Sequence, residues 1–251
     1  MKLKDKMIAV TGAAQGIGRA VVEVALSHGA KAALIDVTET VHDTAKAVDP
    51  DGTRTLAIQA DVTDEAAVAA AFDQIGPLDG LVNNAAIIVK GDFLSIAPED
   101  LDRVYSVNLR GYFVVAQQAV KHMSDGAAIV NMSSVNGQVA IPDQTAYTIM
   151  KGGVNQMTKV MALTLAPRAI RVNAVAPGSI ATALFRSVVA NPDALKTVLS
   201  RTPLGHPGEP DDVGELVAFL LSHESAYITG EIVTIDGGRM ALNYTVPVKD
   251  G

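Results

Sequence analysis

Short apolar runs and amphipathic stretches alternate along this 251-residue chain. Runs such as residues 7–10 and 32–35 are apolar throughout, which is typical of strands buried on both faces of a parallel sheet. Helical spacing follows each run, and this order favours right-handed crossovers with helices on both sides of the sheet. No linker, repeat or shift in composition interrupts the alternation. We therefore predict a single α/β domain over residues 1–251, with a Rossmann-like, doubly wound, parallel sheet of seven strands.

The pattern also gives the bounds of the expected elements. Strands are expected at residues 7–10, 32–36, 56–60, 78–82, 127–132, 171–176 and 232–236. The two longest helices are expected at residues 99–122 and 145–166. The segment 179–210 is less regular, and we expect one or two helices there, in a mobile segment over the site. A tail follows from residue 239 to residue 251.

Composition excludes several functions. Hydrophobic residues make up 49% of the chain, enough for a large core, and the net charge is −7. With no Lys/Arg run, the sequence gives no electrostatic case for binding nucleic acid or an anionic membrane. The absence of cysteine excludes disulfides and thiolate catalysis. No signal peptide or membrane span is recognisable, so we expect a cytoplasmic protein.

A glycine-rich turn joins the first strand to the first helix. It reads Thr-Gly-Ala-Ala-Gln-Gly-Ile-Gly at residues 11–18. In a strand–turn–helix context, glycines let the backbone approach a pyrophosphate, and the helix start offers free N–H groups. The alternative is a tight turn whose small residues only serve packing. We expect a dinucleotide site formed by Gly12, Gln15, Gly16, Ile17 and Gly18.

The second strand ends in Asp36, 18 residues after Gly18. An acidic residue near this position bonds the adenosine ribose hydroxyls and repels a 2′-phosphate. Val37 and Thr38 follow, so no arginine is placed to receive that phosphate. NAD is therefore favoured over NADP. Asp36 could also cap the next helix, and both roles can coexist.

Tyr147 and Lys151 are four residues apart, which places both side chains on one face of a helix. The unperturbed pKa of a tyrosine is about 10, and an ammonium one turn away would lower it. The pair could then move a proton to or from an alcohol oxygen. The same spacing also occurs in ordinary surface pairs.

Polar residues at strand ends add to this pattern. Asn83 and Asn84 follow the fourth strand, where they can face a ligand or bond neighbouring strands. Asn108 lies within a long helix, so it needs a partner or an irregular backbone. Ser134 follows the fifth strand, 13 residues before Tyr147.

In combination these residues resemble the classical short-chain dehydrogenase/reductase (SDR) family over nearly the whole chain. The matching elements are residues 11–18, Asp36, Asp61-Val62, Asn83-Asn84-Ala85-Ala86, Asn108, Ser134, Tyr147-x-x-x-Lys151, Pro177-Gly178 with Thr182, and 235–238. The family usually has glycine where this chain has Ala86. The extra methyl group matters if the backbone there has a positive φ or touches the ligand.

The resemblance implies a catalytic role for four residues. Tyr147 would be the general acid/base, and Lys151 would lower its pKa and bond the nicotinamide ribose. Ser134, selected over Ser133 by its offset from the tyrosine, would orient the substrate oxygen. Asn108 would hold a water that relays protons from Lys151.

The resemblance also implies the rest of the NAD site. Asp61 and Val62 would flank the adenine, Asn84 would line the cleft beside Pro177 and Gly178, and Ile180 and Thr182 would meet the nicotinamide carboxamide. We expect no metal, because no His/Asp/Glu cluster has ligand spacing.

The substrate is expected to be a small alcohol or ketone, bound by Ser134 and Tyr147 and by the loop between them. Amides such as Asn136 and Gln144 could bond the hydroxyls of a sugar, sugar lactone precursor or polyol, or they could bond the loop itself. Apolar residues nearby suit a small hydrophobic alcohol or a steroid-like ketone instead. A non-catalytic NAD-binding sensor or scaffold is the rival class, and the four intact catalytic positions disfavour it.

A homotetramer is expected for two reasons. The helices at 99–122 and 145–166 carry apolar residues on more than one face. The apolar stretch 240–248 follows the last strand, where we expect little of its own domain to pack on, so a neighbouring subunit would cover it. The alternative for this tail is a frayed terminus.

Overall fold

The computed structural model describes residues 1–188 and 190–248. In that part of the chain seven strands form one parallel sheet of order β3-β2-β1-β4-β5-β6-β7, which confirms the predicted sheet. The strands are β1 (Met7–Thr11), β2 (Lys31–Asp36), β3 (Thr55–Gln59), β4 (Leu78–Asn83), β5 (Met123–Met132), β6 (Arg171–Pro177) and β7 (Ile232–Ile235).

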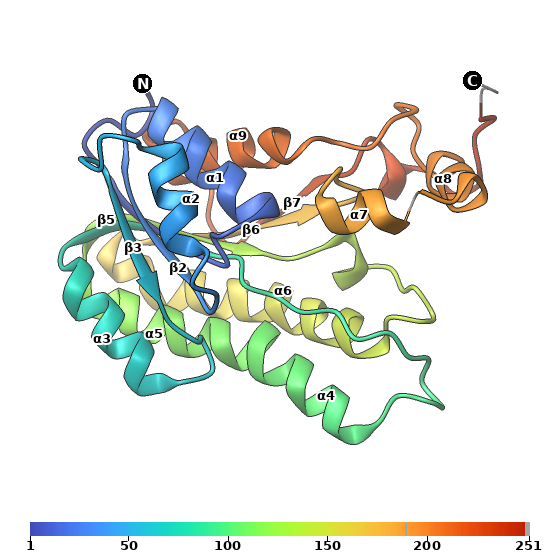
Figure 1. Cartoon of the computed structure of the whole chain (residues 1–251), viewed down its shortest axis with the longest axis horizontal. Helices are drawn as coiled ribbons and strands as arrows, with labels where there is room; N and C mark the ends of the chain where they lie inside the picture. The colour runs from blue at the N-terminus through green and yellow to red at the C-terminus, as the bar shows by residue number, and fades with distance from the viewer. Residues whose placement is uncertain (189, 249–251) are drawn as a thin grey trace.

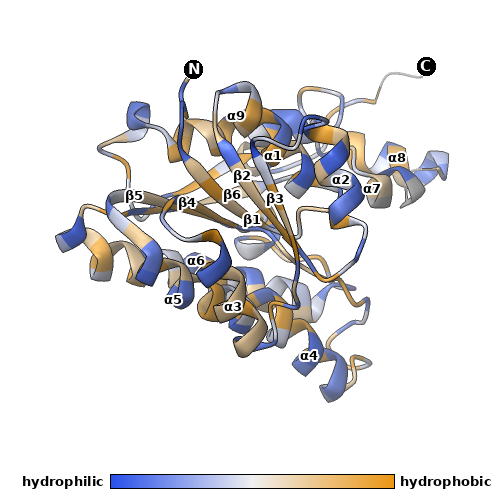
Figure 2. Cartoon of the chain, turned by 60° about the vertical axis from the view of Figure 1, so that its left-hand side comes forward, coloured by the Kyte–Doolittle hydropathy of each residue, from blue (hydrophilic) through white to orange (hydrophobic). Residues whose placement is uncertain are grey.

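Helices cover both faces of the sheet (Figure 1). The first layer consists of α1 (Gly16–Ser27), α2 (Val41–Val48) and α9 (Pro210–Leu221). The opposite layer consists of α3 (Glu65–Ile75), α5 (Tyr112–His122) and α6 (Thr145–Leu165). Each layer packs its apolar side chains on the sheet and forms a separate core, and Figure 2 shows the apolar colour of the strands between them.

The strand order reverses at β1. This strand pairs with β2 on one side and with β4 on the other, so the chain winds away from β1 in both directions. The carboxyl ends of β1 and β4 therefore mark a topological switch point, and open α/β sheets bind ligands at such points.

The helix predicted at 99–122 is divided in the structure. It begins as α4 (Pro98–Tyr105), continues through a π-helical turn at Ser106–Gly111, and ends as α5. Asn108 is fully buried in that turn, where its side chain donates to the Ile87 carbonyl at 2.8 Å and accepts from the Ile87 N–H at 2.9 Å. Both features expected around a buried mid-helix asparagine are present, a partner and an irregular backbone.

Two helices lie in the irregular segment 179–210, α7 (Ala183–Val188) and α8 (Pro192–Leu199), as predicted. Burial of the tail against a neighbouring subunit stays a prediction, and as far as residue 248 the tail also contacts its own chain. The tail returns onto its own chain, where the Val246 N–H donates to the Ser200 carbonyl at 2.8 Å, just after α8. Figure 1 shows the tail in red beside α8. Residues 249–251 lie outside the described part.

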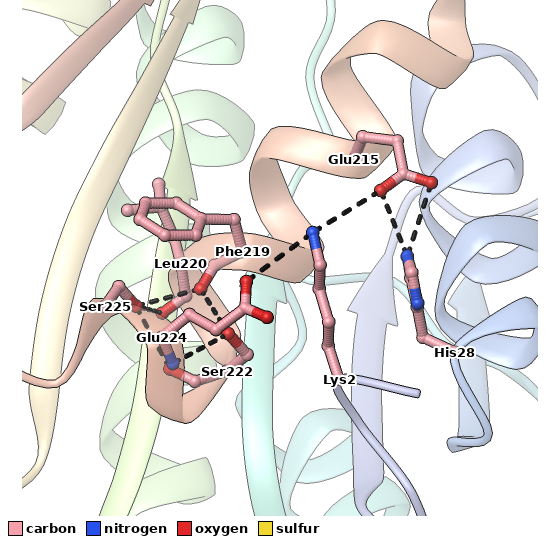
Figure 3. A network of polar contacts seen from close by, with 8 residues as sticks. All are labelled: Lys2, His28, Glu215, Phe219, Leu220, Ser222, Glu224 and Ser225. Carbon is pink, nitrogen blue, oxygen red and sulfur yellow. Dashed lines mark hydrogen bonds and ion pairs between the residues drawn. The ribbon is translucent and has the colours of Figure 1, made fainter.

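The amino-terminal segment contacts α9 and the short turn that follows it (Figure 3). Lys2 Nζ lies 3.9 Å from Glu215 Oε2 and 3.7 Å from Glu224 Oε2, and His28 Nε2 lies 3.0 Å from Glu215 Oε2. Because both carboxylates are more than half exposed, these ion pairs orient the segment more than they stabilise it. None of the helices described is long and apolar enough to cross a bilayer.

Candidate active site

A cavity of about 800 Å³ lies at the carboxyl ends of the strands. It brings together most of the residues predicted from the sequence. The predicted residues on its wall are Gly12, Gln15, Gly16, Ile17, Asp36, Asp61, Val62, Asn84, Ser134, Asn136, Gln144, Tyr147, Lys151, Pro177, Gly178, Ile180 and Thr182. Gly18 and Asn108 do not line it. A Cβ on Gly18 would lie 2.1 Å from the Gly12 carbonyl oxygen. This glycine therefore lets α1 pack closely against the glycine turn, although it does not line the cavity itself.

The glycine turn has the shape that a pyrophosphate site requires. Gly12 and Gly16 have φ of +65° and +57°, a conformation that side chains rarely adopt. A Cβ on Gly12 would lie 2.8 Å from Ala85 Cα, so the turn also packs tightly on the loop after β4. Gln15 occupies the N-cap of α1 without a side-chain capping bond, and the first turn has no acidic residue. The start of α1 can therefore present N–H groups to an anion.

Asp36 connects the glycine turn to the loop after β2. One carboxylate oxygen accepts from the Ala14 N–H at 3.0 Å, and the other accepts from the Thr38 N–H at 3.0 Å and the Thr38 hydroxyl at 2.8 Å. The alternative role as a helix N-cap is wrong, because α2 begins at Val41 after Thr40. Asp36 thus places a fixed negative charge on the cavity wall.

The two asparagines after β4 have different partners. The Asn83 amide donates to Asn131 Oδ1 at 3.0 Å. Of its two expected roles, Asn83 therefore has the one in which it bonds a neighbouring strand. The Asn84 amide donates to the carbonyls of Thr11 at 3.0 Å and Gly12 at 3.1 Å, so it fastens the glycine turn to β4. Ala86 is exposed and has no positive φ, so its methyl group causes no backbone strain.

Tyr147 and Ser134 meet on the cavity wall. Burial raises the pKa of Tyr147, and a side-chain hydrogen bond with Ser134 lowers it in part. Lys151 is 1% exposed, and burial lowers its pKa to about 7. The predicted lowering of the Tyr147 pKa by Lys151 is not found, because burial disfavours the charged form of both groups.

A second tyrosine, which was not predicted from the sequence, holds Lys151. Lys151 Nζ donates to the Met132 carbonyl at 2.6 Å and to the Tyr112 hydroxyl at 3.2 Å. The Tyr112 hydroxyl itself donates to the Met132 carbonyl at 3.2 Å, and the whole side chain is buried. Tyr112 precedes Lys151 by 39 residues, a separation with no periodic signal.

The loop after β5 fixes its own polar groups. Ser133, the rival of Ser134, donates its hydroxyl to Asn155 Oδ1 at 2.6 Å. The Ser134 oxygen accepts from the Asn136 N–H at 3.1 Å, and the Asn136 amide donates to Gln144 Oε1 at 2.9 Å. This last bond favours the interpretation in which the amides hold the loop. Two arginines that were not singled out, Arg201 and Arg239, also line the cavity.

Comparison with known proteins decides the family. A family model described as Enoyl-(Acyl carrier protein) reductase matches residues 12–240. A solved short-chain dehydrogenase/reductase from Serratia marcescens aligns with a TM-score of 0.88 and 36% identity, over 95% of this chain and 99% of that one. The chain belongs to the short-chain dehydrogenase/reductase family. It is therefore an oxidoreductase that acts on CH–OH groups of small molecules with a nicotinamide cofactor, NAD or NADP.

Two curated SDR relatives show how widely the match extends. Oxidoreductase UcpA of Salmonella typhimurium is 40% identical over 94% of this chain and 95% of its own length. The cis-4-hydroxycyclohexanecarboxylate dehydrogenase of Sinomonas cyclohexanicum is 38% identical over 95% of this chain and 98% of its own length. The described residues also fit the cofactor, because the glycine turn, the uncapped start of α1 and Asp36 line one cavity.

Proposed function

We propose that this SDR is an NAD-dependent dehydrogenase that interconverts a secondary alcohol and its ketone or lactone. One observation carries the proposal: Tyr147 and Ser134 share one cavity with a glycine turn shaped for a pyrophosphate. When bound, the nicotinamide supplies hydride chemistry, while the protein supplies position and proton transfer.

The proton transfers are assigned to four residues. Ser134 and Tyr147 bind the substrate oxygen, and Tyr147 takes the hydroxyl proton during oxidation. Lys151 is assigned to the nicotinamide ribose, and with its pKa at about 7 it can take up and release protons near neutrality. Both polar atoms of the Asn108 side chain are hydrogen-bonded to the main chain of Ile87. A proton relay at Asn108 would therefore use the main chain of Asn108.

NAD is proposed over NADP on the basis of Asp36. Its carboxylate is held on the cavity wall by three donors, and the wall around it, at Val37, Thr38 and Asp61, carries no cation. A ribose with free hydroxyls can bond such a carboxylate, whereas a 2′-phosphate is repelled. Asp61 and Val62 are assigned to the adenine, and Ile180 and Thr182 to the carboxamide.

Three classes of substrate can be compared with the residues of the cavity wall. A sugar or polyol would use Asn136 and Gln144, but these two amides bond each other. A small hydrophobic alcohol or steroid-like ketone would use the apolar part of the wall, such as Ile141 and Val198. The Sinomonas relative is named for a hydroxy carboxylate, which adds a third class. A homotetramer and a cytoplasmic location stay predictions.

Tyr147→Phe tests the proposed function. We expect turnover of secondary alcohols, followed by NADH absorbance, to fall by about 10²–10⁴-fold or more, because the general base is lost. NADH affinity, measured by calorimetry, should change little, which separates this enzyme from a non-catalytic NAD sensor. Tyr105→Phe, at a tyrosine 43% exposed on α4, is the matched control. Near-normal turnover by Tyr147→Phe would refute the assignment.

A further inference from the structure

A second cavity of about 310 Å³ adjoins the substrate end of the first. Arg201 and Arg239 line both cavities, so the two guanidinium groups lie where the cavities meet. The second cavity also contains Val139 and Ala140, from the loop that begins at Ser134, but neither Asp36 nor Asp61. The arginines therefore lie at the catalytic end of the site and away from the adenine end.

Two loops fix this pair of arginines. Arg201 follows α8, and Arg239 follows β7. The loops are joined by a hydrogen bond from the Leu204 N–H to the Gly237 carbonyl at 3.1 Å. Tight packing adds to this bond, since a Cβ on Gly238 would lie 3.1 Å from Pro203. The two cations are thus held together by backbone contacts.

Neither guanidinium has a carboxylate within ion-pair distance in the described residues. Arg201 makes one long contact, from Nε to the Thr197 carbonyl at 3.4 Å, and no hydrogen bond from the Arg239 side chain is found in that part of the chain. The nearby Asp236 carboxylate accepts hydrogen bonds from the N–H groups of Gly238 at 2.9 Å and Met240 at 2.6 Å. Arg239 is half-buried, and burial and the charge of Arg201 both lower its pKa, with Asp236 opposing.

Two like charges held close together, one of them on the half-buried Arg239, are unfavourable unless an anion joins them. Guanidinium groups suit a carboxylate because their planar donors can bind both of its oxygens. The cavity that holds the arginines and Tyr147 is also lined by the apolar side chains of Ile141 and Val198, which suit a carbon skeleton.

We propose that Arg201 and Arg239 bind the carboxylate of a hydroxy acid whose secondary hydroxyl group is oxidised at Tyr147. This rests on the function proposed above. Oxidation would break the carbinol C–H bond and form a C=O bond, with the hydride taken by the bound nicotinamide and the hydroxyl proton taken by the ionised Tyr147. The carboxylate keeps its charge throughout and serves only in recognition.

The first test compares an acid with its neutral analogue. The 4-hydroxycyclohexanecarboxylates and the corresponding carboxamides present the same ring and hydroxyl group, and differ in charge. We expect the wild type to prefer the acid in kcat/KM. The acid-to-amide ratio should fall by about 10–100-fold in Arg239→Gln and Arg201→Gln, because each loses a charged hydrogen bond. Arg239→Lys should retain part of the preference for the acid, because lysine keeps the charge. Arg103→Gln, at an exposed arginine on α4, should leave the acid-to-amide ratio unchanged.

The second test measures binding without turnover. Cyclohexanecarboxylate has the ring and the charge but no hydroxyl group, so we expect it to bind the NADH complex in calorimetry and to compete with alcohol substrates. Cyclohexanecarboxamide should bind at least about tenfold more weakly, and the difference should vanish in Arg239→Gln.

The outcomes separate the two proposals. If the wild type oxidises neutral alcohols as well as acids, and binds acid and amide equally, the carboxylate assignment is wrong and the dehydrogenase assignment stands. If Arg239→Gln weakens NADH binding and leaves the acid-to-amide ratio unchanged, the arginines serve the cofactor and the proposal fails. If no alcohol is oxidised at all, the proposed function fails first.

Discussion

Lys151 Nζ lies 3.2 Å from the Tyr112 hydroxyl and 4.9 Å from the centre of the Tyr112 ring. The buried phenol, which does not line the substrate cavity, therefore holds the lysine together with the Met132 carbonyl. A hydrogen bond that accepts from the ammonium favours its charged form, and so opposes the effect of burial.

Tyr112→Phe removes this hydroxyl and keeps the ring. We expect kcat to fall by about tenfold, the value of one hydrogen bond to a charged group, because Lys151 loses part of its orientation. The free energy of unfolding should fall by about 1 kcal/mol, measured by urea denaturation. Tyr105→Phe is the control for loss of a tyrosine hydroxyl. Unchanged kcat in Tyr112→Phe would mean that Met132 alone positions Lys151.

Lys151→Met should alter how stability depends on pH. The Lys151 pKa is about 7 in the folded protein, against 10.5 for an unperturbed lysine, so between these values the folded state binds fewer protons at this group. The free energy of unfolding of the wild type therefore rises with pH in that window relative to Lys151→Met, by up to about 1.4 kcal/mol per pH unit.

Urea denaturation without cofactor, at about pH 7.5 and about pH 9.5, measures this difference. We expect the free energy of unfolding of the wild type, relative to that of Lys151→Met, to rise by about 2 kcal/mol from the lower pH to the higher. Lys159→Met, an exposed position on the same helix, should show no such gain. A pH-independent difference for Lys151→Met would mean that Lys151 stays charged through the window.

Asp36→Ala should reduce cofactor discrimination. We expect the wild type to prefer NAD⁺, and the ratio of kcat/KM for NAD⁺ over NADP⁺ to fall by at least about tenfold once the carboxylate is gone. Stability should also fall by about 1–2 kcal/mol, because Ala14 and Thr38 lose their acceptor. Asp51→Ala, in an exposed turn, is the control. A wild type that prefers NADP⁺ would contradict the prediction.

The outer faces of α5 and α6 predict self-association. Phe113, Val160 and Leu163 are 51%, 62% and 79% exposed, which is unusual for side chains of this size. Light scattering after size exclusion should give a tetramer mass for the wild type and a smaller assembly for Leu163→Glu. Gln156→Glu, exposed on the same helix, should keep the wild-type mass. A monomeric wild type would end the prediction.

Features set by neighbouring residues were predictable from the sequence. The glycine turn and the strand before it follow from local spacing and backbone sterics, and the structure has both. For Asn108 the sequence predicts a partner or an irregular backbone, because a polar amide inside an apolar helix needs one of them, but it does not name Ile87 as the partner.

Features that depend on distant contacts were not predictable. The pKa of Lys151 depends on burial by elements that meet only in the folded chain. Tyr112 belongs to a run of four aromatic and aliphatic residues, and nothing local distinguishes it from its neighbours. Arg201 and Arg239 become neighbours through one backbone hydrogen bond between two loops, which no periodicity in the sequence marks.

That bond between Leu204 and Gly237 also bears on how the protein could be redesigned. The two loops that it joins carry both arginines, whereas Ser134, Tyr147 and Lys151 lie on the loop after β5 and on α6. A mutagenesis library confined to residues 201–205 and 238–242 would therefore vary what the enzyme accepts and spare the groups that perform the chemistry. Gly237 should be kept fixed in such a library, since its φ of +64° favours glycine and a Cβ there would lie 2.9 Å from the Thr202 side chain.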